Sequence, residues 1–184
     1  RAEWGKFIAA FYDKEVEAGK LFDEMVARYE EAKQKVLAIS YQPSVFLNTA
    51  WDDSWSVPQK DSYVGVLLRD AGANYLFAHE EGTGSSYLGF EAIMDVAKDA
   101  DFWLNPGMAT DLAGLAAMDA RYADFAAFAS GKVYNTTARV NEFGGSDYYE
   151  SGVANPDKVL MDLIAILHPG LLEGYELYYY KQLD

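Results

Sequence analysis

The chain has 184 residues, of which 51% are hydrophobic and 24% are charged, a balance typical of a folded globular protein with a buried core. Its formal net charge of -14 argues against a nucleic-acid partner, because the chain has few cations to neutralise a phosphate backbone. It contains no cysteine, which excludes disulfides, thiolate zinc sites and cysteine nucleophiles.

The first predicted element is one helix over residues 1–37. Apolar residues recur there at steps of three and four, with charged residues between them. At 1.5 Å per residue such a helix would be roughly 55 Å long, which exceeds the width of a small domain. The apolar stripe is too irregular for a coiled-coil heptad, so we expect this helix to bridge two lobes.

The rest of the chain alternates between strands and helices. Strands are predicted over residues 44–48, 74–78, 101–104 and 132–137. Helices are predicted over residues 63–70, 90–98, 110–129 and 156–169. The tail, residues 171–184, is expected to end in a short packed segment. This order predicts an α/β fold: a mostly parallel sheet of about four to five strands with helices on both faces.

The last predicted helix has the clearest boundaries. Asn155 is a favourable N-cap, Pro156 suits the first helical position, and Pro169 with Gly170 ends the helix. The loop before it is rich in glycine and tyrosine. This contrast predicts a scaffold helix that follows a loop belonging to a site.

Four loops are candidates for a binding surface. In an open parallel sheet, ligands lie at the carboxyl ends of the strands. That rule selects the loops at residues 49–58, 79–88, 105–109 and 138–150. These loops are also the richest in Trp, Tyr, Gly and Ser, a composition that suits a cleft for a planar or apolar ligand.

Several blocks of the sequence, taken in order and with their spacing, resemble a known family. They are Trp55-Ser-Val-Pro58, Asp61-Ser-Tyr63, Phe90-Glu-Ala-Ile93, Ala100-Asp-Phe-Trp-Leu104, Gly131-Lys-Val-Tyr134 and Asp147-Tyr-Tyr-Glu-Ser-Gly152, followed by the run from Asn155 to Pro169. The chain resembles the carboxyl-terminal lobe of the helical-backbone (class III) periplasmic binding proteins, which serve ABC importers of iron–siderophores, haem and cobalamin.

The resemblance implies two α/β lobes joined by one long helix, with the ligand in a shallow cleft between them. Residues 1–37 would be the interlobe helix and residues 38–184 the carboxyl-terminal lobe, while the amino-terminal lobe has no counterpart here. The ligand would be a small metal chelate or a tetrapyrrole, and the protein partner an ABC permease. No cofactor and no catalysis are implied. The location would be periplasmic or extracytoplasmic, and we expect any leader or lipid anchor to lie outside this fragment.

Five aromatic or charged residues in the loops have two interpretations each. Trp51 and Trp55 would face the ligand, or would pack beneath their loop. Arg139 would pair with a siderophore carboxylate or a haem propionate, or would form a surface salt bridge with an acidic neighbour. Tyr148 and Tyr149 would stack on the ligand or offer a phenolate to iron, or would pack in the core with the hydroxyl at the surface.

Three further residues complete the predicted sites. Tyr87, in the glycine-rich loop before residue 90, and Asn141 are predicted to contact the ligand. Glu91 begins the helix at residues 90–98, and the resemblance implies that it docks on an arginine of the permease. The simpler alternative for Glu91 is an acid favoured by the positive end of the helix dipole.

The sequence leaves two other classes of function open. An enzyme on a similar scaffold could use Asp52, Asp53 or Glu80 as acid/base groups near the strand ends, although the sequence shows no pairing of a nucleophile with a base. The two histidines, His79 and His168, lack the spacing of metal ligands. A third possibility is a lobe that binds another protein and no small ligand.

Overall fold

The computed structural model describes all 184 residues, and its centre is a five-stranded sheet. The strand order is β4-β1-β6-β7-β8, in which β1, β4, β6 and β7 run parallel and β8 returns antiparallel. The strands are short: β1 Ser44–Leu47, β4 Asn74–Tyr75, β6 Phe102–Leu104, β7 Val133–Asn135 and β8 Lys181–Gln182. The prediction of an α/β fold with a mostly parallel sheet is therefore confirmed.

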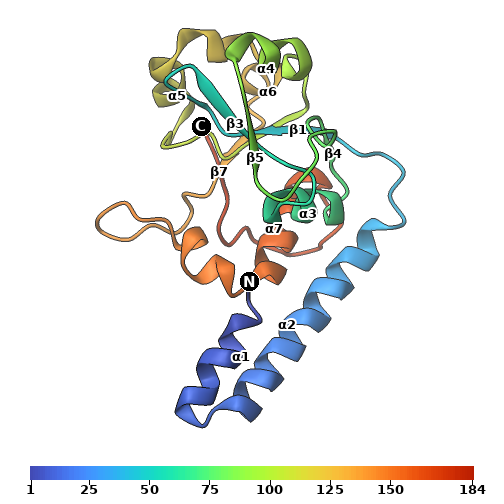
Figure 1. Ribbon diagram of the computed structural model, residues 1–184. Helices are drawn as coiled ribbons and strands as arrows, with labels where there is room; N and C mark the ends of the chain where they lie inside the picture. Colours follow the sequence, from blue (N-terminus) through green and yellow to red (C-terminus); the bar gives the residue numbers. More distant parts are fainter.

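Helices cover both faces of this sheet, as Figure 1 shows. On one face lie α3 (Tyr63–Asp70) and α7 (Pro156–Leu167), and on the other lie α4 (Phe90–Ala97), α5 (Leu112–Met118) and α6 (Ala126–Ala129). Short 3-10 turns, η2 (Ala120–Asp124), η3 (Asp147–Tyr149) and η4 (Ser151–Val153), complete the connections. Helix α3 comes between β1 and β4, helix α4 comes between β4 and β6, and the two helices cover opposite faces of the sheet. The order of the strands therefore reverses between β1 and β6. In open α/β sheets, ligands bind at such a reversal.

Two of the predicted loops form a second, antiparallel sheet instead. Its strands are β2 (Ala50–Trp51), β3 (Ser54–Pro58) and β5 (Ser85–Leu88). Asp52 and Asp53 connect β2 to β3 with positive φ angles of 49° and 59°, as a two-residue type I′ hairpin turn requires. Strands of two to five residues carry too little periodicity to be recognised in the sequence.

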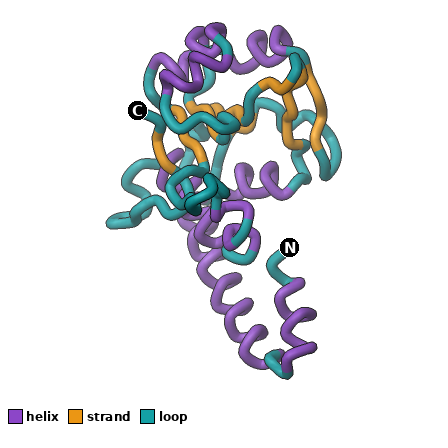
Figure 2. The backbone as a smooth tube through the Cα atoms, turned by 90° about the vertical axis from the view of Figure 1, so that its left-hand side faces the viewer, coloured by secondary structure: helices purple, strands orange, loops and turns teal.

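The helix predicted over residues 1–37 is divided in two, so the prediction of one unbroken helix is wrong. Helix α1 (Trp4–Ala9) continues into the 3-10 turn η1 (Ala10–Tyr12), and α2 (Glu15–Val36) begins after a reversal. At the reversal Asp13 has a φ of 52°, a left-handed conformation that Asp tolerates better than most residues. The two helices form a hairpin that projects from the α/β body (Figures 1 and 2). The 22 residues of α2 span about 33 Å.

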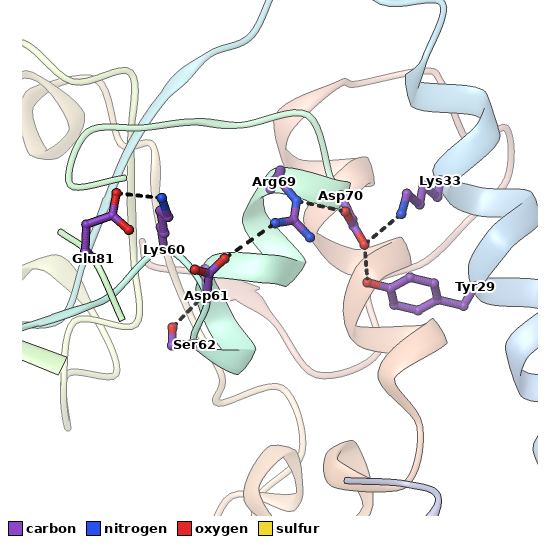
Figure 3. Close-up of polar contacts among 9 residues, drawn as sticks. Tyr29, Lys33, Lys60, Asp61, Ser62, Arg69, Asp70 and Glu81 are labelled. Carbon is purple, nitrogen blue, oxygen red and sulfur yellow. Dashed lines mark hydrogen bonds and ion pairs between the residues drawn. The ribbon is translucent and has the colours of Figure 1, made fainter. Parts of the chain in front are cut away.

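Two buried carboxylates fix α2 to the body. Asp70, at the end of α3, accepts hydrogen bonds from Tyr29 Oη at 2.9 Å and from Lys33 Nζ at 3.2 Å, as Figure 3 shows. Asp157, in the first turn of α7, is fully buried and lies 2.6 Å from Arg28 Nε. Burial and the Asp70 carboxylate together raise the pKa of Tyr29 above its usual value. These contacts hold α2 rigidly against α3 and α7.

The core between the sheet and helices α4 to α6 is aromatic. Trp55 and Trp103 are fully buried, and their ring centroids lie 6.0 Å apart. Phe46 stacks on Trp103 at 5.0 Å, and Tyr122 meets Trp55 edge-on at 5.8 Å. Trp55 Nε1 donates to the Leu47 carbonyl at 2.7 Å, so its polar group is satisfied inside the core.

The tail packs into the body, as predicted. Tyr179, Tyr180 and Leu183 are buried, and strand β8 adds an edge to the main sheet. The fully buried carboxylate of Asp162 in α7 accepts hydrogen bonds from three successive backbone amides of the tail. No helix of the chain combines the length and the apolar character that crossing a bilayer requires.

Candidate functional site

A pocket of about 660 Å³ lies at the carboxyl ends of β6 and β7, and we call it the main pocket because it lies at the predicted binding edge. Its wall comes from the loop after β6, the loop after β7 and the first residue of β8. The side chains that give it chemical character are Met108, Thr110, Thr136, Thr137, Ser146, Tyr149 and Lys181. The volume falls within the range of small-molecule sites. Two of the four predicted loops, residues 105–109 and 138–150, therefore converge on one pocket.

Asn135, at the end of β7, holds the loop after β6 in place. The buried Nδ2 of Asn135 donates to the carbonyls of Gly107 at 3.0 Å and of Ala109 at 2.7 Å. Gly107 has a φ of 60°, and a Cβ there would lie only 2.8 Å from Thr49 Oγ1. A glycine is thus required on both conformational and steric grounds. The same close approach places the entry to the small sheet directly beside the pocket.

The opposite wall is a hairpin over residues 140–146, which projects from the body (Figure 1). Asn141 Oδ1 closes the hairpin by accepting from the backbone amides of Phe143 at 2.9 Å and Gly145 at 2.8 Å. At its base Arg139 Nε lies 3.0 Å from Asp147 Oδ2, and this hydrogen bond holds the pKa of Asp147 below its usual value. The hairpin therefore has a fixed base and an internally braced tip.

Trp51 and Tyr87 both point outward from the small sheet. They are 87% and 71% exposed. In the register of this sheet, Trp51 pairs with Ser54 and Tyr87 pairs with Ser56, so all four lie on the same outer face. Trp51 and Tyr87 are therefore available to a ligand, although neither lines the pocket.

For Trp55 and Tyr148, the packing interpretation describes the structure. Trp55 is fully buried and has no surface with which to contact a ligand. Tyr148 is 8% exposed and packs edge-on against Tyr179 and Tyr180, with ring centroids 6.1 Å and 5.9 Å away. Burial raises the pKa of Tyr148 above its usual value and so disfavours a phenolate at this position. Exposed Tyr149 lines the pocket in its place.

Arg139 and Asn141 line a separate hollow of about 480 Å³ on the outer side of the hairpin. Both side chains are already engaged. Arg139 pairs with Asp147 and lies 4.5 Å above the ring of Tyr178, while Asn141 braces the hairpin. The cation of the main pocket is instead Lys181, which sequence reasoning missed because it lies in the tail, far along the chain from the pocket loops.

Exposed apolar side chains are concentrated in the four predicted loops. Outside residues 1–37, nine large hydrophobic side chains are exposed, and six of them belong to the four predicted loops. These six are Trp51, Tyr87, Met108, Val140, Phe143 and Tyr149. Large apolar side chains that gather on one surface mark a site of interaction. The predicted binding edge therefore carries most of the exposed apolar surface of the α/β body.

The remaining candidates lie elsewhere. Glu91 is exposed in the first turn of α4, and its nearest cation, Arg121, lies 3.9 Å away. Asp52 and Asp53 form the hairpin turn of the small sheet, and Glu80 accepts a hydrogen bond from Ser86 Oγ at 2.6 Å. These three acids have structural positions, and none lines the main pocket.

The histidines also occupy separate environments. His79 lies at the surface, 3.5 Å from Glu80. His168 is buried at the end of α7, where its Nε2 lies 3.0 Å from the Ala71 carbonyl oxygen. No group of three or more His, Asp or Glu side chains is arranged to hold a metal ion.

Comparison with known proteins agrees with this fold. The family model described as periplasmic binding protein matches residues 2–140. An uncharacterized lipoprotein from Methanocaldococcus jannaschii is 31% identical over 184 residues, which are 98% of this chain and 42% of that protein. The chain thus spans less than half the length of this relative.

Solved structures of similar fold are also longer than this chain. The TroA-like periplasmic binding protein FepB from Veillonella parvula has a TM-score of 0.71 at 13% identity, covering 100% of this chain and 62% of that one. The periplasmic heme-binding protein RhuT from Roseiflexus sp. RS-1 has a TM-score of 0.68 at 18% identity, covering 93% of this chain and 63% of that one. The resemblance to helical-backbone periplasmic binding proteins is confirmed, and this chain belongs to the periplasmic binding protein family.

Proposed function

We propose that this chain is the ligand-binding lobe of an ABC importer's binding protein for an iron–siderophore, haem or a corrinoid. It would hold the ligand in a cleft shared with an amino-terminal lobe and deliver it to the permease. The function is binding, and no step of catalysis is assigned to the lobe. A lipid-anchored relative supports an extracytoplasmic location. Protease accessibility on intact cells tests that location.

The observation that carries this proposal is the composition of the carboxyl edge. A pocket large enough for a small molecule opens there between aromatic and apolar side chains that are otherwise exposed to water. Exposed rings suit a large, partly apolar ligand, and the hydroxyl groups of the pocket suit polar atoms at its periphery. The solved haem-binding protein of similar fold supports this ligand class.

The helical hairpin supports a site shared between two lobes. Helix α1 and the turn η1 bury none of their residues, and their apolar stripe is exposed: Trp4 at 68%, Phe7 at 58%, Ile8 at 56% and Phe11 at 74%. The rings form a ladder in which Trp4, Phe7 and Phe11 meet edge-on. We propose that residues 1–37 are the interlobe element and that an amino-terminal lobe covers this stripe. The α/β body, residues 38–184, would then supply half of the cleft.

A titration tests the proposed function. Ferric siderophores, haem and cobalamin are added to this chain, alone and joined to an amino-terminal lobe, while tryptophan fluorescence is followed. We expect quenching at micromolar ligand for at least one class, with tighter binding when both lobes are present. Trp51→Ala should weaken that binding about fivefold, because an exposed ring contributes about 1 kcal/mol when it stacks on a ligand.

Val96→Ala is the matched control. Val96 is an exposed apolar residue on α4, outside the predicted loops, so its truncation should leave the affinity unchanged. Failure of all three ligand classes to bind the two-lobe protein would overturn the proposed function. Equal affinities for wild type and Trp51→Ala would show that Trp51, and with it the small sheet, does not contact the ligand.

We also propose that Glu91 contacts the permease. Its side chain is 85% exposed at the start of α4, and its contact with Arg121 at 3.9 Å is too long to neutralise it. A free carboxylate at this position can pair with an arginine of another protein. Glu91→Ala in the two-lobe protein should lower transport in cells at least tenfold while leaving the affinity for ligand unchanged.

The control for Glu91 is its neighbour one turn along the helix. Asp95 is also exposed on α4 and lies on the same face, so Asp95→Ala removes the same charge from an adjacent position. A specific docking contact predicts little effect of Asp95→Ala. Equal losses of transport in the two variants would indicate a general effect of charge, and normal transport by Glu91→Ala would exclude the contact.

A further inference from the structure

The pocket at the carboxyl ends of β6 and β7 has a charge that differs from the rest of the molecule. The chain carries a formal net charge of -14, yet no acidic side chain lines this pocket. Lys181 is the single charged residue in its wall. Resting on the proposed function, we propose that the ligand presents an anionic oxygen group, of the carboxylate class, and that Lys181 binds it.

The position of Lys181 follows from the register of the main sheet. Strand β8 pairs with β7 so that Lys181 lies opposite Asn135, the residue that holds the loop after β6. Paired residues of two strands point to the same face. The backbone of Lys181 therefore lies in a part of the pocket wall that hydrogen bonds hold in place. The position of the side chain does not depend on the projecting hairpin.

The ammonium of Lys181 is not already neutralised. Its nearest acid is Asp184, whose Oδ1 lies 4.0 Å from Nζ, and the two side chains are 55% and 87% exposed. Such a surface pair is weak and is easily exchanged for a better partner. The chain as a whole is acidic, so a weakly paired ammonium in a pocket wall that has no acidic side chain provides a local attraction for an anion.

The hydroxyl groups beside Lys181 favour the same ligand chemistry. Thr137 lines the pocket, and its Oγ1 is buried without any hydrogen-bond partner. A buried hydroxyl without a partner is unfavourable, and an acceptor atom of a bound ligand would remove that cost. An anionic oxygen would accept hydrogen bonds from the Thr137 hydroxyl and the Lys181 ammonium together.

Lys181, and not Arg139, is the cation available to an anionic ligand. Arg139 was the anion partner predicted from the sequence, but Asp147 and the ring of Tyr178 occupy its guanidinium. Arg139 faces the outer hollow, whereas Lys181 faces the main pocket. Geometry and free charge both favour Lys181.

Two pairs of probes that differ in charge test the inference in the two-lobe protein. One pair is haem and its dimethyl ester, which lacks the two carboxylates. The other is the ferric citrate complex, which is anionic, and ferrichrome, which is uncharged. We expect Lys181→Met to weaken binding of the anionic member about tenfold, the loss of one charge-assisted hydrogen bond. Binding of the uncharged member should change less than twofold, and Lys181→Arg should retain most of the affinity.

Lys132→Met is the charge-matched control, because Lys132 precedes β7 at the opposite end of the strand. It should leave every affinity unchanged. If the wild-type protein binds a probe and Lys181→Met binds its anionic form equally well, the inference is overturned while the proposed function stands. The same holds if Arg139→Met alone reduces that binding, or if only uncharged probes bind. If no probe binds the wild-type protein, the proposed function itself fails.

Discussion

Replacing Asp162 with alanine should lower the free energy of unfolding by about 4 kcal/mol, because several buried donors would lose a charged acceptor. Asp162 is fully buried and accepts from the backbone amides of Tyr178 at 2.8 Å, Tyr179 at 2.7 Å and Tyr180 at 3.0 Å. It also accepts from Tyr175 Oη at 2.6 Å. For a chain of this size the melting temperature should fall by about 8–16 °C.

A graded series separates the carboxylate from general effects of substitution. Tyr175→Phe removes one of the four donors and should cost about 1 kcal/mol. Glu173→Ala changes an exposed acid in the same tail and should cost less than about 0.5 kcal/mol. Thermal unfolding followed by circular dichroism measures all three. A cost for Asp162→Ala no larger than that for Tyr175→Phe would show that the backbone amides find other acceptors.

Asp162 also links stability to the pocket. The tail that it holds continues directly into β8, which carries Lys181. Loosening the tail therefore removes the cation that we assign to the ligand. The positive charge that Lys181 gives the pocket therefore depends on Asp162 in α7, although α7 does not line the pocket.

The periodicity of the sequence was sufficient to predict the main sheet and most of its helices, but the single helix predicted over residues 110–129 is wrong, because that range is divided into α5, η2 and α6. The parallel strands are short and mostly buried, and a helix with an apolar face lies between each of them and the next strand of the main sheet, so the alternation is visible in the chain. Strand β8 could not be predicted, because two residues, Lys181 and Gln182, show no alternation. Its antiparallel return depends on the amides bound by Asp162, a contact between distant parts of the chain.

The break in the first helix could not be predicted for a related reason. The apolar residues on either side of Asp13 keep the helical spacing, so the pattern continues through the reversal. What ends η1 is the left-handed conformation of Asp13 itself. A single residue of this kind leaves hydrophobic periodicity unchanged, and Asp alone is a weak turn signal.

The candidate site was predicted at the level of loops more accurately than at the level of residues. The carboxyl-edge rule selected the loops at 105–109 and 138–150, which do line the pocket. It could not separate Tyr148 from Tyr149, since neighbouring residues in a short 3-10 turn point in different directions. Tyr148 packs on the tail and Tyr149 faces the pocket, a distinction that tertiary contacts decide.

Trp55→Ala should be as damaging as the loss of Asp162, with a cost of about 4 kcal/mol in the free energy of unfolding. Trp55 is fully buried among five aromatic neighbours, Phe46, Phe90, Trp103, Tyr122 and Phe125, whose ring centroids lie 5.8–6.2 Å away. Its removal leaves a cavity and deprives the Leu47 carbonyl of its donor. Urea unfolding measures the change.

Trp51→Ala is the contrasting variant on the same sheet. Trp51 is 87% exposed, so its truncation should change the free energy of unfolding by less than about 0.5 kcal/mol while weakening ligand binding. The two tryptophans lie on adjacent strands and point to opposite faces, since Trp51 pairs with Ser54, the neighbour of Trp55 along β3. Equal destabilisation by the two variants would contradict this alternation. If Trp55→Ala keeps its stability and loses only ligand affinity, Trp55 contacts the ligand in the cleft.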